Sequence, residues 1–358
     1  MNKSKAAALI LCLACSAPVL SGCAATDNMA LIKVAAKGKN DKITYGYAKF
    51  DAHLTQAMYE TTYSSYFGDD MWSKDISGDG STMEDTVKKN LIKSMEEQYV
   101  LVNNAEDYKI KLSSADKKKI SKAAKKFMKN NSKSTLNAIG ASQELAEEYL
   151  RNQTISDKVK TAIEAEADTT VTDEEANQKK VSYVFFNTIT KTDSSGKSVA
   201  VTSDDEARLK EQAEELAAAG DFDSEVSTLG LTANDLTFGA TELKDARKNK
   251  SYTDSSGNSL PYDLLKACDA LSDGQTTSVI KDNKGFYVAH MVSVSDSEST
   301  ETERKKLEQQ KKSDYYDKVL KKYESKISFD VNKFLWKQVR FLDKFKLKQT
   351  STNKKSGN

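Results

Sequence analysis

The sequence is poor in the residues that most often build catalytic and metal-binding sites. Its 358 residues include two histidines, His53 and His290, and four cysteines. Three of the cysteines lie in or directly after an apolar N-terminal run, which leaves Cys268 without a partner for a disulfide or a metal site. This composition argues against a histidine-based hydrolase and against a zinc site. We therefore expect no metal and no cofactor, and we interpret Cys268 as a small core residue.

The sequence also lacks an excess of charge of either sign. The 54 Lys and Arg residues are balanced by 53 Asp and Glu residues, so the formal net charge is +1. Without a field of one sign there is no electrostatic basis for a nucleic-acid partner, and we predict none. Because 30% of the residues are charged and 38% are hydrophobic, we expect a very polar surface over two or three domains of ordinary size.

The N-terminus has the pattern of a signal peptide. Two lysines precede an apolar run at 6–19, which is too short to span a membrane as a stable helix. Residues 20–23, Leu-Ser-Gly-Cys, then resemble a bacterial lipobox, which implies cleavage after residue 22 and acylation of Cys23. An ordinary signal peptide with an incidental cysteine is the alternative. Since two or more acyl chains anchor a protein stably, we expect residues 23–31 to tether a lipoprotein to the extracytoplasmic face of a bacterial cell membrane.

Residues 32–178 are predicted to form a helical domain that begins with a short strand pair. The clearest helix is expected at 84–105, where Val87, Leu91 and Met95 recur at helical spacing. Thr82 with an acid three residues later resembles a capping box at its start. Further amphipathic helices are expected at 115–129 and 142–165, and a helix start at Val171-Thr172-Asp173-Glu174-Glu175.

One loop in this region has the oxygen spacing of a calcium site. Asp75-Ile76-Ser77-Gly78-Asp79-Gly80 places oxygen side chains at the first, third and fifth positions and glycine at the sixth. The twelfth position is Thr86, where an EF-hand needs a bidentate Glu. The pattern therefore favours a polar turn before the 84–105 helix over a calcium loop.

Residues 179–297 change to a pattern of strands and helices. We expect strands at 181–186 and 285–292, a helix at 207–219, and a second helix with Pro261 at its first position. This order indicates a compact α+β unit with a central sheet. Two insertions rich in Ser, Asp and Gly, at 190–203 and 244–260, each contain Asp-Ser-Ser-Gly and are predicted to form a hairpin or an exposed loop.

The sequence pattern of this unit resembles that of the parvulin family of peptidyl-prolyl isomerases, or rotamases. The residues on or close to the family pattern are Ser182, Phe222, Leu236, Phe238, Pro261, Leu271, Gly274, Ser278, Val279 and Gly285. The resemblance implies an FKBP-like superfold and an apolar cup for a proline ring. The residues that it places in this cup are Leu236, Phe238, Tyr262 and Leu265. The insertion at 244–260 is positioned to lengthen or cover its rim.

The catalytic positions of the family are changed in this sequence. The two family histidines fall at Tyr183 and Tyr287, and the family's acidic or cysteine residue has no counterpart at 228–232. Proline isomerisation needs no covalent chemistry, only an apolar cup and polar groups that favour the twisted amide. The sequence allows two interpretations of these tyrosines, and it therefore does not decide whether the protein is an isomerase. The tyrosines either keep a polar scaffold, since phenol donates and accepts, or pack a sheet with no catalytic role.

The C-terminal part returns to charged helical composition at 298–346. A helix is expected at 301–326, then a short extended piece and a last helix. The apolar stripe of that last helix comprises Val331, Leu335, Val339, Leu342 and Phe345. Such a stripe is too apolar for free exposure to water, so we expect these helices to pack on the N-terminal domain. Residues 347–358 are predicted to be a disordered tail.

The order of all these parts resembles PrsA- and SurA-type extracytoplasmic foldases, with the best local match at 90–98. The resemblance implies an α+β protein in which a multi-helix chaperone domain, formed by both chain ends, carries an inserted parvulin-like domain. The expected role is in protein secretion, as a membrane-anchored chaperone that binds unfolded, newly secreted polypeptides. The alternative is a non-catalytic surface lipoprotein that uses both folds as a binding or assembly scaffold. A homodimer is left open.

Overall fold

The computed structural model describes residues 13–14, 24–36, 38–68, 70–254, 256–342 and 346–347. Cys23, most of the signal segment, and residues 348–358 of the predicted tail lie outside the described residues. In the part that is described, no helix is both long and apolar enough to cross a bilayer. The chain divides into two compact units, which we call the first unit (1–167 with 313–358) and the second unit (168–312).

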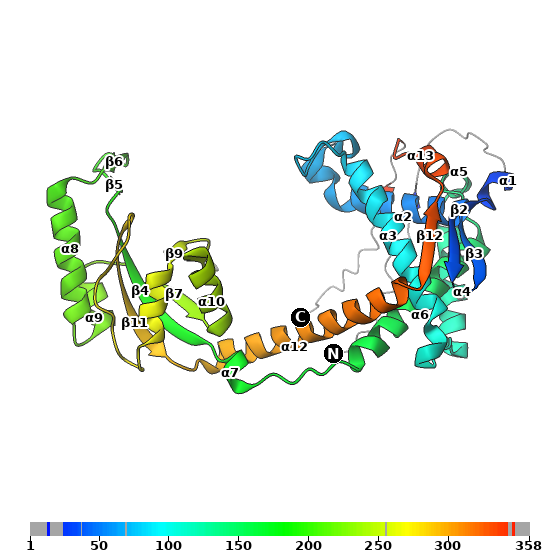
Figure 1. Cartoon of the computed structure of the whole chain (residues 1–358). Helices are drawn as coiled ribbons and strands as arrows, with labels where there is room; N and C mark the ends of the chain where they lie inside the picture. Colours follow the sequence, from blue (N-terminus) through cyan, green and yellow to red (C-terminus); the bar gives the residue numbers. More distant parts are fainter. Residues whose placement is uncertain are drawn as a thin grey trace, which may run out of the picture. The chain divides into compact units, whose positions relative to one another are not determined.

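The first unit contains a three-stranded antiparallel sheet in the order β12-β2-β3 (Figure 1). β2 (Ala30–Ala36) and β3 (Lys39–Thr44) form the predicted strand pair around Gly38, whose φ is 74°. β12 (Ile327–Val331) comes from the other end of the chain and pairs with β2. Both chain ends therefore contribute to one domain, as predicted, and they do so through a shared sheet, which the sequence did not indicate. The two-residue strands β1 (Leu13–Ala14) and β13 (Lys346–Leu347) also pair with each other.

Side-chain caps fix where the helices of the first unit begin. Thr44 accepts the backbone N–H of Tyr47 at the start of α2 (Tyr45–Phe67). Thr82 and Asp85 form a complete capping box at the start of α3 (Met83–Asn103), as the sequence predicts. The other described helices of this unit before the second unit are α1 (Ala24–Asp27), α4 (Ser114–Asn130), α5 (Lys133–Ala138) and α6 (Gln143–Ala165), with single turns η2 (Met71–Ser73) and η3 (Ala105–Tyr108).

The last helix is shorter than predicted. α13 ends at Gln338, so it covers Lys333–Gln338, and the next residue, Val339, is extended with φ −75° and ψ 111°. The carbonyl of Val339 accepts a hydrogen bond from the buried Lys88 at 2.5 Å, a contact that replaces a helical partner. Leu335, Val339 and Phe341 are buried in the core of the first unit, whereas Leu342 is exposed. The continuous helical stripe is therefore wrong at Val331, which belongs to β12, and at Val339 and Leu342, which follow α13, whereas Phe345 lies outside the described residues. The packing of this segment on the N-terminal part is confirmed.

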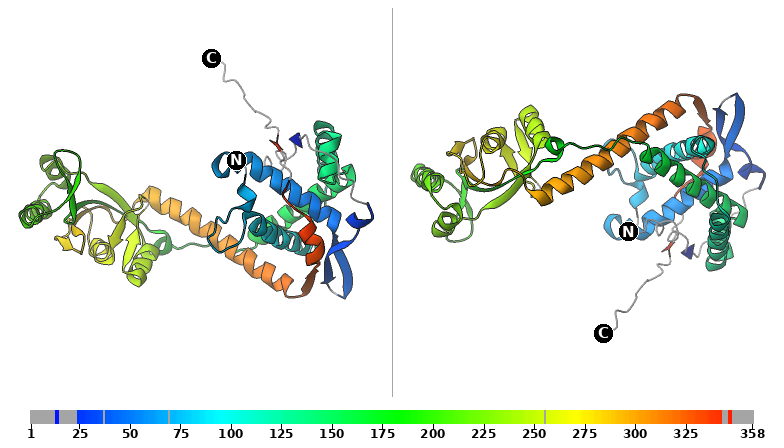
Figure 2. Two further views of the ribbon diagram at one scale, coloured as in Figure 1. Left: turned by 90° about the horizontal axis from the view of Figure 1, so that it is seen from above. Right: turned by 90° about the horizontal axis from the view of Figure 1, so that it is seen from below.

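The second unit is built on a four-stranded antiparallel sheet in the order β10-β11-β4-β7. Its strands are β4 (Lys179–Asn187), β7 (Asn234–Phe238), β10 (Ile280–Lys281) and β11 (Gly285–Ser293). Alternate residues of β4 face opposite sides, and both sides are buried. α8 (Ser203–Ala218) and α9 (Phe222–Thr228) cover one face, and α10 (Ala240–Asn249) and α11 (Tyr262–Asp269) cover the other (Figure 2). The predicted α+β class is confirmed.

Both Ser/Asp/Gly-rich insertions contain short hairpins. The first is formed by β5 (Thr190–Thr192) and β6 (Ser198–Ala200), and the second by β8 (Ser251–Thr253) and β9 (Ser259–Pro261). Pro261 precedes α11 as its N-cap, one position earlier than predicted, because its backbone still belongs to β9.

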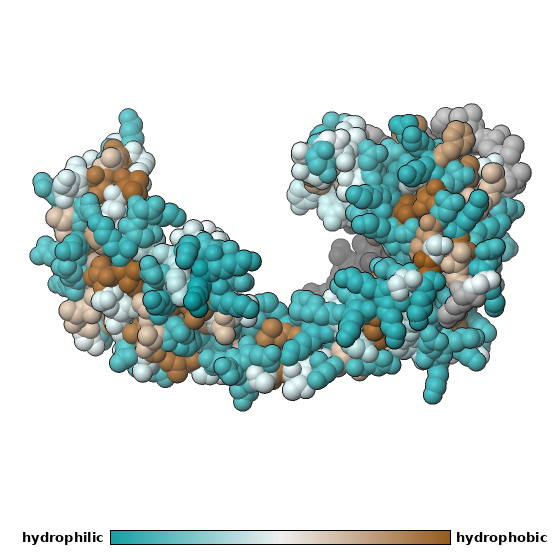
Figure 3. Space-filling model, in the orientation of Figure 1, coloured by the Kyte–Doolittle hydropathy of each residue, from teal (hydrophilic) through white to brown (hydrophobic). Residues whose placement is uncertain are grey.

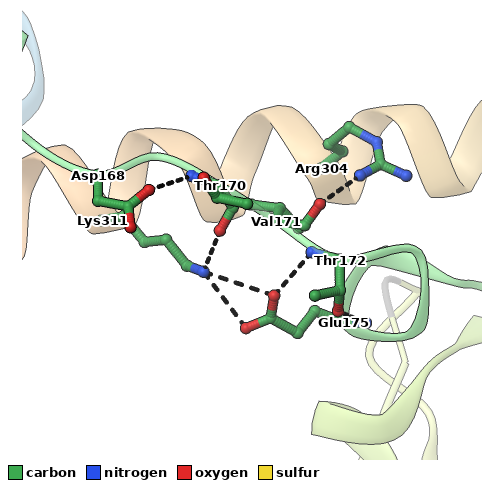
Figure 4. A network of polar contacts seen from close by, with 7 residues as sticks. All are labelled: Asp168, Thr170, Val171, Thr172, Glu175, Arg304 and Lys311. Carbon is green, nitrogen blue, oxygen red and sulfur yellow. Dashed lines mark hydrogen bonds and ion pairs between the residues drawn. The ribbon is translucent and has the colours of Figure 1, made fainter.

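Two positive side chains of α12 (Ser297–Glu324) fix the start of the second unit (Figure 4). Lys311 donates to the carbonyl of Thr170 at 2.6 Å, and Arg304 donates to the carbonyl of Val171 at 2.8 Å. α7 (Asp173–Ala176) follows at once and begins with the capping box of Thr172 and Glu175. The predicted helix start at this position is confirmed.

Candidate functional site

The six residues predicted for an isomerase site lie together in one apolar cluster of the second unit. Tyr183 of β4 and Tyr287 of β11 project from the same face of the sheet, because Tyr183 pairs with Ala289 and Tyr287 with Phe185. The remaining four come from β7 and α11: Leu236, Phe238, Tyr262 and Leu265. The sheet therefore assembles the expected set from residues far apart in the sequence.

The assembled residues are closed off from solvent. Of the six, only Tyr262 is partly exposed, and the other five are no more than 2% exposed. A cup that receives a proline ring has to present apolar surface to solvent before it binds. In this structure that surface is already covered.

The second hairpin provides the cover. Tyr252 of β8 and Leu260 of β9 are paired across the hairpin, and both pack into the same apolar cluster as Tyr183 and Leu265. Leu260 is 2% exposed. The insertion that the sequence placed at the rim of the predicted cup thus contributes two side chains to the apolar cluster that contains the predicted cup residues.

A polar contact joins the hairpin to the predicted catalytic position. The hydroxyl of Tyr183 donates to Oδ2 of Asp254 at 3.0 Å. Nδ2 of Asn258 donates to the same carboxylate oxygen at 2.9 Å and to the Tyr183 hydroxyl oxygen at 3.3 Å. All three side chains are consequently held in one small network at the base of the loop between β8 and β9.

Burial and hydrogen bonding set the protonation states of this network. Burial, reinforced by the hydrogen bond to the Asp254 carboxylate, raises the pKa of Tyr183 to about 12. Burial alone would raise the pKa of Asp254, but hydrogen bonds from Asn258, Tyr183 and Ser256 outweigh it, so the pKa lies below its ordinary value. At neutral pH the pair is therefore a neutral phenol that donates to a carboxylate.

Asp254 was not predicted as a site residue, although the sequence carries a signal for it. Asp193 opens the other Asp-Ser-Ser-Gly segment and makes the same turn: each aspartate accepts backbone N–H groups two and four residues later. Its surroundings differ, because Asp193 is in an exposed hairpin whereas Asp254 is 7% exposed. The repeat marks the turn, but only the fold brings one of the two carboxylates to Tyr183.

Tyr287 and Cys268 complete the buried face. The ring of Tyr287 stacks on Phe185 with centroids 4.7 Å apart, and burial, followed by the nearby carboxylate of Asp282, raises the pKa of its hydroxyl. Burial raises the pKa of the Cys268 thiol to about 12, which makes it unreactive in the folded state. Cys268 is a core residue, in agreement with the sequence.

A second candidate site is a series of aromatic rings in the first unit. Adjacent rings contact each other at centroid distances between 4.6 and 6.3 Å. We call this the aromatic series; its members in order of contact are Phe67, Tyr63, Tyr59, Trp72 and Phe341. Trp72 and Phe341 also line a cavity of about 490 Å³, together with Leu342, Lys337 and Arg340.

In the calcium-like loop, the carboxylate oxygens of Asp75 accept hydrogen bonds from the loop's own backbone. The Asp75 carboxylate accepts the backbone N–H groups of Gly78 at 2.7 Å and Gly80 at 2.8 Å, and these bonds lower its pKa. The loop forms a polar turn before α3, which is the favoured interpretation of the sequence. Nowhere in the described part of the chain do three His, Cys, Asp or Glu side chains lie close enough to share a metal ion.

Neither a protein-family model nor a curated protein matches the sequence. Among solved structures, the peptidylprolyl isomerase PrsA from Bacillus cereus is 18% identical with a TM-score of 0.31, covering 75% of this chain and 99% of that chain. The foldase protein PrsA from Streptococcus pneumoniae is 16% identical with a TM-score of 0.27, covering 74% of this chain and 97% of that one. A structure from a study of two SurA-like chaperones of Campylobacter jejuni, PEB4 and Cj1289, is 10% identical with a TM-score of 0.27, covering 84% and 98%. Because these TM-scores and sequence identities are low, the candidate site rests on the contacts within this chain alone.

Proposed function

We propose that this protein is an extracytoplasmic folding factor that binds unfolded polypeptides through the first unit and is tethered to the membrane by lipid on Cys23. The observation that carries the proposal is the aromatic series and the exposed apolar side chains next to it. Tyr66 is 82% exposed at the end of α2, and Leu342 is 72% exposed beside Phe341. Figure 3 shows that hydrophobic residues form small patches within a mostly hydrophilic surface.

The chemistry of this surface suits an unfolded chain better than a small molecule. Tyrosines and tryptophan offer large apolar faces with polar tips, and such residues dominate the binding energy of protein interfaces. The lining of the cavity beside them carries both signs of charge: Asp70, Glu84 and Asp85 are acidic, and Lys88, Lys337 and Arg340 are basic. A surface of this kind can accept varied side chains without selecting one sequence.

The test is suppression of aggregation. Reduced, denatured lysozyme would be diluted into buffer with the chain from residue 24 onwards, and light scattering followed. Replacing Tyr63, Tyr66 and Leu342 by Ser should raise the half-suppressing concentration roughly fivefold or more. The matched control replaces Ile189 and Val292, exposed apolar residues of the second unit, by Ser and should behave like the parent chain. Equal loss in both variants, or no suppression by the parent chain, would remove the proposal.

A second candidate function is isomerisation of X-Pro bonds by the second unit. It is favoured by the convergence of the six expected residues on one sheet face, with the Tyr183 hydroxyl inside the set. A protease-coupled assay on X-Pro peptides with varied X tests it, with a two-histidine parvulin as positive control. Activity that falls on Tyr183→Phe or Tyr287→Phe supports the tyrosines as the polar scaffold. No rate above background in a folded protein would leave the second unit as a binding or assembly scaffold.

The tether is tested separately in a bacterial host. The parent chain should fractionate with membranes and carry a mass increment of acyl groups on its N-terminal peptide. Cys23→Ser should appear in the soluble extracytoplasmic fraction without that increment. Membrane association that survives Cys23→Ser would contradict lipid anchoring and leave an ordinary signal peptide as the alternative.

A further inference from the structure

The β8–β9 hairpin has the features of an internal occupant of the isomerase-like cup. Tyr252 and Leu260 are a cross-strand pair, and both belong to the apolar cluster that contains Leu236, Phe238 and Leu265. A tyrosine ring and a branched aliphatic group have the size and apolar character of the side chains that flank and include a proline. The hairpin thus places on the sheet the kind of surface that a bound X-Pro segment would place there.

We propose that this hairpin is a self-inhibitory cover: it occupies the cup in the resting protein, is latched by the Asp254–Tyr183 hydrogen bond, and is displaced when an X-Pro segment of an unfolded polypeptide binds. The proposal rests on the second candidate function, because it names how access to that same site is controlled. It also assigns Asp254 and Asn258 as positioning residues that act through Tyr183.

The hairpin is built so that it can leave as one piece. Each of its strands has three residues, and two-stranded hairpins of this length are marginal without packing against another element. At its base the N–H of Tyr262 donates to the carbonyl of Lys250 at 3.2 Å, next to the paired residues Ser251 and Pro261. Lys250 has a φ of 64°, an unfavourable conformation for a residue with a side chain, and it marks the point where α10 turns into β8. Displacement of the hairpin therefore requires backbone changes near Lys250 and Pro261 and withdrawal of Tyr252 and Leu260 from the apolar cluster.

The latch adds to the packing of Tyr252 and Leu260 a polar contact that the turn itself does not provide. The β5–β6 hairpin has the same Asp-Ser-Ser-Gly turn with the same backbone hydrogen bonds. There the Asp193 carboxylate accepts hydrogen bonds from the backbone and hydroxyl of Ser195 and from the backbone N–H of Lys197, all within an exposed loop. In β8–β9 the second oxygen of Asp254 is used by Tyr183 and Asn258. The chain therefore contains its own matched control for the turn without the latch.

The experiment uses the chain from residue 24 onwards and a fluorescein-labelled Ala-Leu-Pro-Phe peptide. Fluorescence anisotropy measures peptide binding, and hydrogen exchange by mass spectrometry measures opening of residues 251–261. Asp254→Ala removes a charge-assisted hydrogen bond, so it should speed exchange in the hairpin and tighten peptide binding roughly tenfold. Asp254→Asn leaves one acceptor oxygen where the aspartate uses two and removes the charge, so its effect should lie between those of the parent chain and Asp254→Ala. Asp193→Ala should match the parent chain.

The outcomes separate cleanly. Tyr183→Phe keeps the ring packing and loses only the hydroxyl, so it should reproduce the effect of Asp254→Ala even if that variant folds poorly. Faster hairpin exchange without tighter peptide binding would overturn the cup as a covered site, and unchanged exchange would overturn the latch. Tighter peptide binding without isomerisation would contradict the isomerase function but would still support the hairpin as a cover. Suppression of lysozyme aggregation, which belongs to the first unit, should be unchanged in every one of these variants.

Discussion

The hydroxyl of Tyr183 lies 3.0 Å from Oδ2 of Asp254, although 71 positions separate the two residues in the sequence. Tyr183 belongs to a central strand of the second unit, and Asp254 to the loop of a short hairpin. The contact therefore ties an inserted element to the position where the resembled family has a histidine. It makes the insertion part of the site.

Release of this contact should expose Cys268. In the chain from residue 24 onwards Cys268 is the only cysteine, and it is fully buried in the cluster beneath the hairpin. Since burial raises the pKa of its thiol to about 12, little thiolate exists at pH 8 and labelling by a disulfide reagent should be slow. Asp254→Ala should accelerate labelling several-fold, and Asp193→Ala should not. Equal rates in the two variants would show that the hairpin does not shield the cluster.

The buried Asp51 of α2 should make the first unit less stable as the pH rises. Burial raises the pKa of Asp51 to about 7, partly offset by a hydrogen bond with Tyr149, whereas an unfolded aspartate titrates near about 3.9. Its favourable contribution is thus complete below about pH 4, falls as the pH rises to about 7, and is constant above. Asp51→Asn removes this dependence and should raise the free energy of unfolding at pH 8 by at most about 4 kcal/mol, with little change at pH 4.

Urea unfolding followed by tryptophan fluorescence measures this effect, because Trp72 and Trp336 are the only tryptophans and both belong to the first unit. Asp116 provides a control of opposite sign. The hydrogen bond from Lys158, followed by those from Ser113, lowers the pKa of Asp116 to about 2, so its contribution is present above about pH 4 and is lost as the pH falls through about 2. Asp116→Asn should therefore destabilise at pH 8. Parallel curves for the parent chain and Asp51→Asn would contradict the assignment.

Gly285 should tolerate no side chain. A Cβ at this position would lie 2.0 Å from the carbonyl oxygen of Phe186 on the neighbouring strand, and backbone cannot move aside as a side chain can. Gly285→Ala should destabilise the second unit by more than about 2 kcal/mol, as the strands separate to admit the methyl group. Gly220→Ala is the control, since nothing lies within 4 Å of its Cβ position. Cys268 labelling in a urea series reports this unit, and equal midpoints for the two variants would refute the prediction.

Local rules account for the parts of the fold that the sequence predicts well. Thr82 and Asp85 cap α3 within one turn, and Thr172 with Glu175 begins α7 in the same way, so neither needs information from elsewhere in the chain. The short, nearly continuous apolar runs at 181–186 and 285–292 likewise predict β4 and β11, whose two faces are both buried. The six site residues were found through resemblance to a family, and the structure brings them together in one cluster; their catalytic role stays a prediction.

Contacts between distant residues account for the parts that were missed. α13 ends early because Lys88 binds the carbonyl of Val339 from 251 positions away, which no periodicity can show. Asp254 was interpreted as a turn residue because its turn role is local and its bond with Tyr183 is not. The sequence also places the insertion at the rim of the cup, yet whether it lengthens or fills the cup depends on where Tyr252 and Leu260 pack.

The start of the second unit should loosen when its two cationic partners are removed. Lys311 and Arg304 donate to two successive carbonyls of residues 170–171, and Lys311 also pairs with Glu175 (Figure 4). Arg304 pairs with Asp173. These are partly exposed, charge-assisted bonds, so each is modest and is weakened by salt. Arg304→Met or Lys311→Met should increase proteinase K cleavage within 168–172 by roughly two- to fivefold, about as much as raising NaCl to about 0.5 M does in the parent chain. Lys312→Met, which changes the adjacent lysine, is the control and should leave the cleavage rate unchanged. If Lys312→Met raised cleavage by the same factor, the loss of positive charge on α12, and not the loss of these two bonds, would explain cleavage within 168–172.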